Sequence, residues 1–184
     1  MKKINIALIV LTIALSLITV FSELDKGIVV VLKDLSIILT LFLPYILNKI
    51  FKLKINEKLI FIWIIFIFLA HYMGVILQLY FSWPYLDKVT HTLSGVLSAG
   101  AAIIILERVK SKNKYFNVLF ILSFTWLCAG LWEVFEFTCN ALFGGDAQRV
   151  ALTGVTDTML DMIVAFIGSI IVSTIYIINK NKHK

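Results

Sequence analysis

Apolar residues dominate this chain in six long runs, which short polar connections separate. The runs lie near residues 4–22, 28–48, 58–81, 87–106, 116–143 and 154–178. Each run is close to the length of about 20 apolar residues that an α-helix needs to cross the hydrocarbon core of a bilayer. The pattern therefore predicts an all-α integral membrane protein, a six-transmembrane-helix bundle that forms a single polytopic domain over residues 1–184.

The composition supports a membrane location and excludes a nucleic-acid-binding function. Hydrophobic residues make up 60% of the chain, and the mean hydropathy is +0.97. The net charge of +6 comes from basic residues in short clusters between the apolar runs, and not from one continuous basic surface. The first run follows Lys2 and Lys3, but no pair of small residues marks a cleavage site after it, so we interpret it as a retained span.

The distribution of basic residues predicts the topology. If the runs alternate across the membrane, 13 of the 17 Lys and Arg residues lie on one side. These are at the N-terminus, after the second run, after the fourth run and in the C-terminal tail. The opposite side holds only Lys26, Lys33, Lys88 and Arg149. Because cytoplasmic loops carry the excess of Lys and Arg, both termini are predicted in the cytoplasm.

Two of the runs have internal features. Lys33 and Asp34 interrupt the second run, so we expect residues 24–33 to be an interfacial lead-in and the span to begin near Leu35. Pro44 is expected to kink the same helix. The fourth run repeats small residues four positions apart, which lets helices approach closely and predicts the central packing helix. These repeats are Gly95-x-x-x-Ala99 and Ser98-x-x-x-Ala102.

Two glutamates, Glu133 and Glu136, lie within the fifth apolar run. An ionised carboxylate deep in a bilayer costs a few kcal/mol or more, so their presence there needs a reason. Residues three apart on a helix share one face. With the predicted topology, both glutamates lie about 10–15 Å below the outer surface.

Three other runs place ionisable residues at similar depths in the same outer half. Within the fourth and sixth runs the residues are four apart, so each helix offers them on one face. No Lys or Arg lies deeper than the interface, and adjacent carboxylates in a low dielectric cannot all stay ionised without a cation. The residues are His71 in the third run, Asp87 and His91 in the fourth, and Asp157 and Asp161 in the sixth.

A divalent metal ion would balance these charges. Imidazole and carboxylate ligands without a thiolate suit zinc, manganese or iron. Glu133 would then be the general base that takes a proton from metal-bound water. Asp87 and Asp157 would support the ligands from outside the metal's coordination sphere. The expected metal ligands are His71, His91, Glu136 and Asp161.

Each of these residues also has a purely structural interpretation. Asp87 could cap the start of its helix, and Asp157 could be stabilised by the helix dipole in a first turn. His71 and His91 could be core histidines that hydrogen bonds satisfy. Asp161 lies too deep for a cap, as do the two glutamates.

Five motifs follow one another between residues 60 and 170. They are His71-Tyr72-Met73-Gly74, Asp87-Lys88-x-x-His91-x-x-Ser94-Gly95, Glu133-x-x-Glu136, Gly144-Gly145-Asp146-Ala147-Gln148, and Asp157-x-x-x-Asp161 with Gly168. This ordered set resembles the YjdF family of bacterial inner-membrane proteins. More distantly, it is similar to the VanZ-like proteins associated with glycopeptide tolerance, although Glu136 and Asp161 depart from that pattern. The resemblance implies a multi-pass protein of the bacterial plasma (inner) membrane and the location of the site, and it implies no reaction.

The sequence favours a metal-dependent hydrolase acting on a membrane lipid or a lipid-linked substrate, because a lipid ester or phosphoester lies at the depth of the acidic residues. One alternative is a cation- or proton-coupled transporter. Transport needs a polar route through the inner half, which offers only hydroxyl side chains and no charge. A third hypothesis is a non-catalytic accessory membrane protein with the acids as packing groups. The hydroxyl residues are Ser98, Ser123, Thr125, Ser169, Ser173 and Thr174.

Overall fold

The structure, a computed structural model, describes residues 1–182 and is helical, with no strand among those residues. Six of its helices are long and apolar enough to cross a membrane, which confirms the six predicted spans. Lys184, one of the residues counted for the topology, lies outside the described residues. The elements are α1 (Lys2–Ser22), the 3-10 turn η1 (Leu24–Lys26), α2 (Ile28–Phe51), α3 (Glu57–Ile67), the π-helix η2 (Phe68–Ile76), α4 (Leu79–Ser82), α5 (Tyr85–Arg108), α6 (Lys114–Phe143), α7 (Val150–Thr153) and α8 (Thr156–Lys182).

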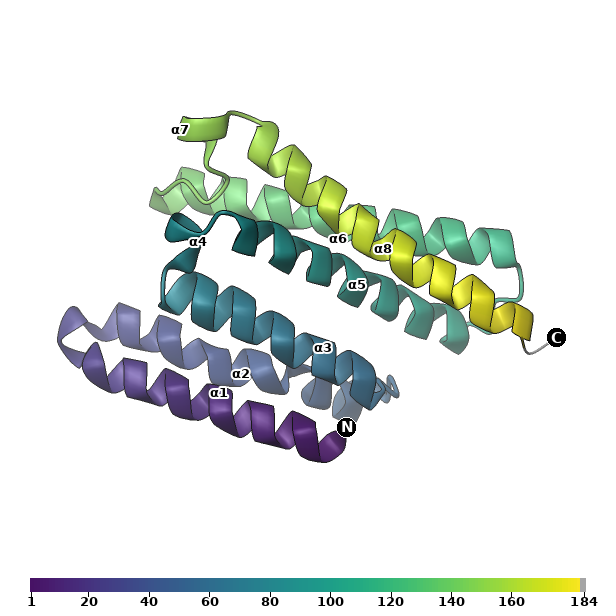
Figure 1. Cartoon of the computed structure of the whole chain (residues 1–184), viewed down its shortest axis with the longest axis horizontal. Helices are drawn as coiled ribbons and strands as arrows, with labels where there is room; N and C mark the ends of the chain where they lie inside the picture. The colour runs from purple at the N-terminus through teal and green to yellow at the C-terminus, as the bar shows by residue number, and fades with distance from the viewer. Residues whose placement is uncertain (183–184) are drawn as a thin grey trace. The chain divides into compact units, whose positions relative to one another are not determined.

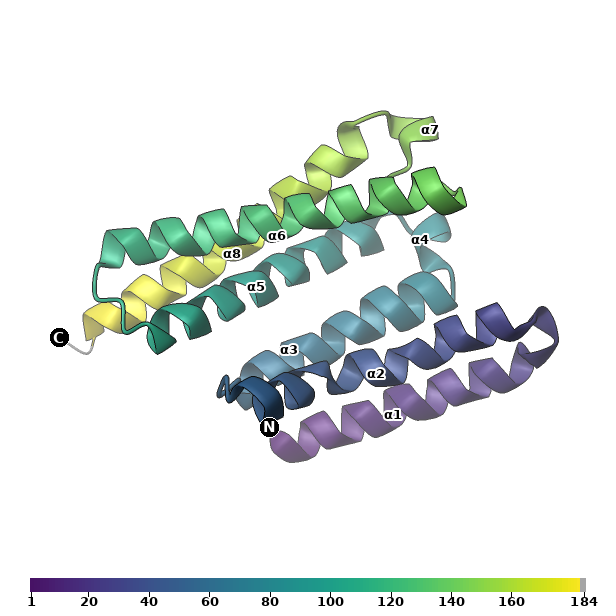
Figure 2. The ribbon, with the colours of Figure 1, turned by 180° about the vertical axis from the view of Figure 1, so that it is seen from behind.

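The helices form two compact units (Figures 1 and 2). The first covers Met1–Thr90 and contains α1, α2, α3 and η2 side by side, whereas the second begins at His91 and contains α6 packed along α8. The division falls in the first turns of α5, which is one continuous helix.

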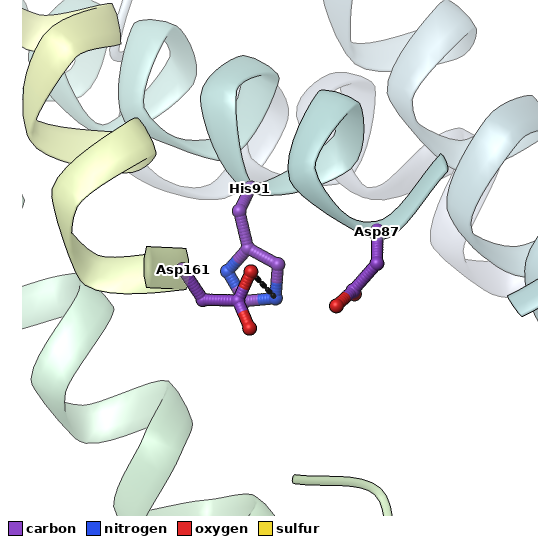
Figure 3. Close-up of side chains that lie close together, drawn as sticks. All are labelled: Asp87, His91 and Asp161. Carbon is purple, nitrogen blue, oxygen red and sulfur yellow. Dashed lines mark ion pairs between the residues drawn. The ribbon is translucent and has the colours of Figure 1, made fainter. Parts of the chain in front are cut away.

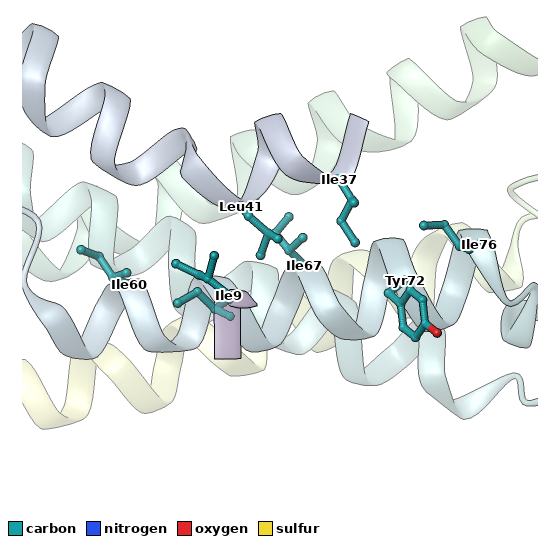
Figure 4. Packing of buried hydrophobic residues seen from close by; sticks show 8 residues of the cluster. Ile9, Ile37, Leu41, Ile60, Ile67, Tyr72 and Ile76 are labelled. Carbon is teal, nitrogen blue, oxygen red and sulfur yellow. The ribbon is translucent and has the colours of Figure 1, made fainter. Parts of the chain in front are cut away.

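The core of the first unit is aliphatic. Ile37 and Leu41 of α2 are completely buried, and Ile60 and Ile64 of α3 are nearly so. Figure 4 shows Ile9, Ile67 and the ring of Tyr72 in the same cluster. Because lipid tails are as apolar as these side chains, close van der Waals packing rather than removal from water holds such helices together.

The second helix begins where its apolar run begins. Gly27 has a φ of 98°, and α2 starts immediately after it at Ile28, so the helix itself extends to the N-terminal side of Leu35. Leu24–Lys26 form a separate turn, and an interfacial position for the residues up to Lys33 stays a prediction. In that turn the Lys26 ammonium lies 2.8 Å from the Glu23 carboxylate, which lowers the pKa of Glu23 and raises the pKa of Lys26.

α2 continues through Pro44 to Phe51. Proline has no N–H, so the carbonyl of Thr40, one turn earlier, loses its helical donor. The indole N–H of Trp63 on α3 donates to this carbonyl oxygen at 2.8 Å. A neighbouring helix thus satisfies the backbone group that the proline leaves open.

The third span ends earlier than predicted. The sequence gives no break before residue 81, but the π-helix η2 stops at Ile76, and Gln78 has a φ of 56°. The short helix α4 follows at Leu79–Ser82. Gly74 makes this turn possible, because a Cβ at that position would overlap the ring of Tyr80.

In the second unit, α5 packs against α8 through glycines. A Cβ at Gly95 would overlap the carbonyl of Ala165, and a Cβ at Gly168 would overlap the carbonyl oxygen of Thr92. Ala99 and Ala102 are completely buried. The small residues of α5 therefore form a close packing face, as the sequence predicts.

Candidate functional site

Three ionisable side chains meet where α5 and α8 pack together (Figure 3). Asp87 and His91 lie one turn apart on α5, and Asp161 reaches them from α8. One ligand atom of each residue lies within 4.8 Å of those of the other two. His91 Nε2 lies 3.8 Å from Asp161 Oδ1.

The arrangement follows from the local sequence. A spacing of four residues places Asp87 and His91 on one face of α5. The glycines of the α5–α8 contact bring the two backbones close, so that the short Asp161 side chain reaches the imidazole. Asp161 is 3% exposed and His91 is 9% exposed, so this pair is shielded from solvent.

Asp87 is the third residue of α5, so it lies in the first turn and is not the N-cap. Its Oδ2 accepts a hydrogen bond from Lys88 Nζ at 3.1 Å. The sequence predicts Asp87 as a supporting residue, whereas its carboxylate lies within ligand distance of His91 and Asp161. Asp157 lies one turn before Asp161 on α8 and is also buried.

Glu133 is buried on α6, and its partner comes from the connection between α6 and α7. Gln148 Nε2 donates to the Glu133 main-chain oxygen at 3.0 Å and to Oε2 at 3.2 Å. The preceding connection turns at Gly144 and Gly145, where φ is positive, and Asp146 accepts from the first backbone amides of α7. Gln148 is 7% exposed, so the loop inserts this amide into the helical unit.

Glu136 and His71 lie in other surroundings. Glu136 Oε1 accepts a hydrogen bond from the Trp132 indole at 2.8 Å. His71 belongs to the π-helix of the first unit, where its Nε2 lies 3.3 Å from the Lys33 carbonyl oxygen and 3.4 Å from Ser36 Oγ. Neither is in the group that Asp87, His91 and Asp161 form, and their roles as metal ligands stay predictions.

The sequence alone does not predict the structural roles of Gln148 and Asp34. Gln148 belongs to a quoted motif, but nothing in the sequence connects it to Glu133. Asp34 of α2 is completely buried, with Lys33 Nζ 3.5 Å from its Oδ1 and no hydrogen-bond donor to either oxygen among the described residues. A signal for its burial exists, because Asp34 shares a helix face with Ile37 and Leu41.

The apolar spans and the buried acidic and imidazole groups define a multi-pass α-helical membrane protein with a histidine–carboxylate cluster between its helices. The DUF2238 family, described as "Predicted membrane protein", has a model that matches residues 4–182. The match covers nearly the whole chain, and the protein therefore belongs to this family. Among curated proteins and solved structures no match is found.

Proposed function

We propose that Asp87, His91 and Asp161 bind one divalent metal ion and that the ion activates water to hydrolyse a lipid or a lipid-linked substrate. The observation that supports this proposal is the mutual approach of the three ligand atoms to within 4.8 Å on two different helices. Two carboxylates beside an imidazole in a low-dielectric interior need a cation or protons to balance their charge, and the Lys88 ammonium, 3.1 Å from Asp87 Oδ2, supplies part of it.

The donor set is one imidazole and two carboxylates, which suits zinc, manganese or iron. Three protein ligands are typical of catalytic metal sites, which keep a further coordination position for water or substrate. A bound metal ion lowers the pKa of such a water molecule towards neutrality. The ligands therefore favour catalysis over a closed structural site.

Glu133 is the proposed general base. It is buried in the same unit as His91 and Asp161, and the Gln148 amide holds one of its oxygens. A positioned carboxylate can take a proton from water as a general base. Gln148 would then be a positioning residue, because it acts through Glu133.

The position along the helices fits a substrate with its reactive group near the headgroups. Asp87 is the third residue of α5, and Asp161 is the sixth of α8. At a rise of 1.5 Å per residue, both lie within roughly 10 Å of their helix ends. An ester or phosphoester of a lipid lies at such a depth.

We also propose which membrane holds the protein and how the protein is oriented in it. The motif resemblance supports a YjdF-like protein of the bacterial inner membrane, with VanZ-like proteins as remoter relatives. The excess of basic residues supports cytoplasmic termini. With that topology, the metal site opens towards the outer leaflet.

The hydrolase proposal is tested with the purified full chain in bilayers that contain phospholipids and a lipid-linked pyrophosphate. We expect release of a water-soluble product that needs a divalent metal and stops with chelator. Glu133→Gln should lower the rate on the order of 10²-fold or more. Asp25→Asn, which changes an exposed carboxylate in η1, is the matched control. Hydrolysis at the wild-type rate by Glu133→Gln would contradict the assignment of the base.

A further inference from the structure

The buried faces of α6 and α8 in the second unit are polar over most of their length. The buried residues of α6 recur every four positions: Asn117, Ile121, Thr125, Ala129 and Glu133. A matching series on α8 consists of Asp157, Asp161, Ala165, Ser169 and Ser173. The two helices lie side by side in opposite directions (Figures 1 and 2). We call these two series together the polar seam.

A hydrogen bond aligns the two series. Asn117 Nδ2 donates to the hydroxyl of Tyr176 at 2.8 Å, which places these residues at one level. From Asn117, Glu133 lies roughly 24 Å along α6, and from Tyr176, Asp161 lies roughly 22 Å back along α8. Thr125 and Ser169 lie about 10–12 Å along the same paths. The polar residues of both helices therefore fall at corresponding levels.

Two hydroxyls of the polar seam have no hydrogen bond within the described residues. They are Thr125 Oγ1, on a residue 1% exposed, and Ser173 Oγ, on a residue 4% exposed. Helical hydroxyls in apolar surroundings usually donate to a carbonyl of the preceding turn, as Ser169 and Thr174 do on α8. A buried hydroxyl without that bond is costly, so these two sites point to a partner that enters the polar seam.

At the basic end of the second unit, the polar seam reaches a cavity. Tyr176 lines this cavity, which has a volume of about 410 Å³, and its hydroxyl accepts the hydrogen bond from Asn117. Glu107, Asn179 and Lys180 line it as well. The polar groups thus extend from Glu133 and Asp157 at one end of the helices, with an interruption at Ala129 and Ala165, to an opening at the other end that Ile103, Val172 and Ile175 also line.

We propose that the polar seam conducts protons along α6 and α8 between the acidic end and this cavity. A hydroxyl accepts a proton on one side while it releases its own on the other, so each transfer leaves the group unchanged and neutral. One proton enters at the acidic end for each that leaves at the cavity, and no other bond changes. A metal ion would need charged ligands in the inner half, which the polar seam does not offer there.

The proposed path has a narrow stage. Between Glu133 and Thr125 the α6 series offers only Ala129, and between Asp161 and Ser169 the α8 series offers only Ala165. Each gap spans about 12 Å. On the α8 side Ala165 packs closely against Gly95 of α5, so a proton crosses this stage only when the helices part enough to admit water. We therefore assign the slowest transfer to this alanine stage. The proposal goes beyond hydrolysis and does not need the metal ion.

The test uses the full chain in lipid vesicles with an entrapped pH-sensitive dye. A potassium gradient with valinomycin makes the interior negative, and we expect the interior to acidify faster than in protein-free vesicles. The double variant Thr125→Val with Ser173→Ala should slow this flux on the order of tenfold or more, because two buried hydroxyls are lost. Thr174→Val and Ser123→Ala are matched controls, since they remove exposed hydroxyls from the same helices and should keep the wild-type rate.

Several results would overturn the proposal. One is folded wild-type protein that conducts no more protons than empty vesicles do, and another is a double variant that conducts at the wild-type rate. A flux that disappears when sodium is replaced by a large organic cation would assign the path to sodium instead. Melting temperature and metal content check folding, and if the double variant does not fold, the two single variants decide. Metal content also keeps this test separate from the proposed hydrolase, because Thr125 and Ser173 are not ligands.

Discussion

Three buried carboxylates, those of Glu133, Asp161 and Asp34, have different surroundings at the scale of single residues. Gln148 donates to Glu133, His91 lies beside Asp161, and Lys33 lies beside Asp34. A charge buried in an apolar environment must be paired, neutralised by a proton or balanced by a metal ion. The neighbour of each carboxylate therefore indicates its role better than its depth does.

Changing Glu133 to glutamine and changing Glu136 to glutamine should have different effects. Glu133→Gln keeps the shape of a group that we propose as a base, so metal content and melting temperature should stay while hydrolysis stops. Glu136→Gln should keep the metal too, because its amide oxygen can still accept the Trp132 indole proton. Elemental analysis and thermal melting of both variants in detergent measure this. Loss of metal from Glu136→Gln would instead make Glu136 a ligand, as the sequence alone suggests.

Asp34 should lower the stability of the folded protein in its present surroundings. Both of its oxygens lack a hydrogen-bond donor among the described residues, and a buried carboxylate in that state is costly. Lys33 is 41% exposed, so water can solvate its ammonium when the carboxylate is removed. We expect Asp34→Asn to raise the melting temperature by about 2–4 °C, the shift that roughly 1 kcal/mol gives in a chain of this size. Asp25→Asn, at an exposed position, should leave the melting temperature unchanged. A lower value for Asp34→Asn would show that the pair with Lys33 stabilises the fold.

At the scale of elements, the close α5–α8 contact should decide whether the site forms. A Cβ at Gly168 would overlap the carbonyl oxygen of Thr92, and backbone cannot move aside as a side chain can. Gly168→Ala should therefore cost about 1–3 kcal/mol and separate Asp161 from His91, with loss of metal. Gly130→Ala is the matched control, because a Cβ there would meet Met162 Cε at an ordinary van der Waals distance of 3.6 Å. Equal melting curves and metal contents for the two variants would contradict this account of the packing.

The sequence predicts the helices well and their ends less well, for physical reasons. Length and hydropathy are enough to place six spans, because a bilayer permits little else than helices. The start of α2 depends on Gly27 and the end of the third span on Gln78, and in both cases a positive φ decides. A Gln in that conformation follows from tertiary packing, and no local pattern predicts it. For the same reason, no local pattern predicts the π-helical turns around His71.

The candidate site is predictable in part. The spacing of four residues correctly places Asp87 and His91 on one face of α5. The small residues of that helix predict that another helix packs closely against it, and in the structure this helix is α8. Which helix faces meet depends on packing between distant segments, so no pattern in the sequence favours Asp87 over Glu136 as a ligand. Gln148 lies in a loop, where periodicity carries no information about the partner, Glu133.

At the scale of the whole molecule, the topology prediction remains to be measured. A reporter at Lys2 and one fused after Lys184 should both report the cytoplasm, because basic residues gather on that side. A reporter inserted between Asp146 and Arg149 should report the opposite side. Protease protection in oriented membranes gives an independent check. A cytoplasmic signal from the insertion would move the proposed site to the inner leaflet and exclude an outer-leaflet substrate.

The metal content of the purified full chain decides whether Asp87, His91 and Asp161 bind a divalent metal ion. We expect about one zinc, manganese or iron ion per chain in protein that has met no chelator, because the proposed site has one set of three ligands. The variant His91→Ala with Asp161→Ala should bind none while it keeps the helical content of the wild type, and Asp25→Asn should keep the full amount. Wild-type protein without a bound divalent metal, or an unchanged metal content in the double variant, would contradict the account.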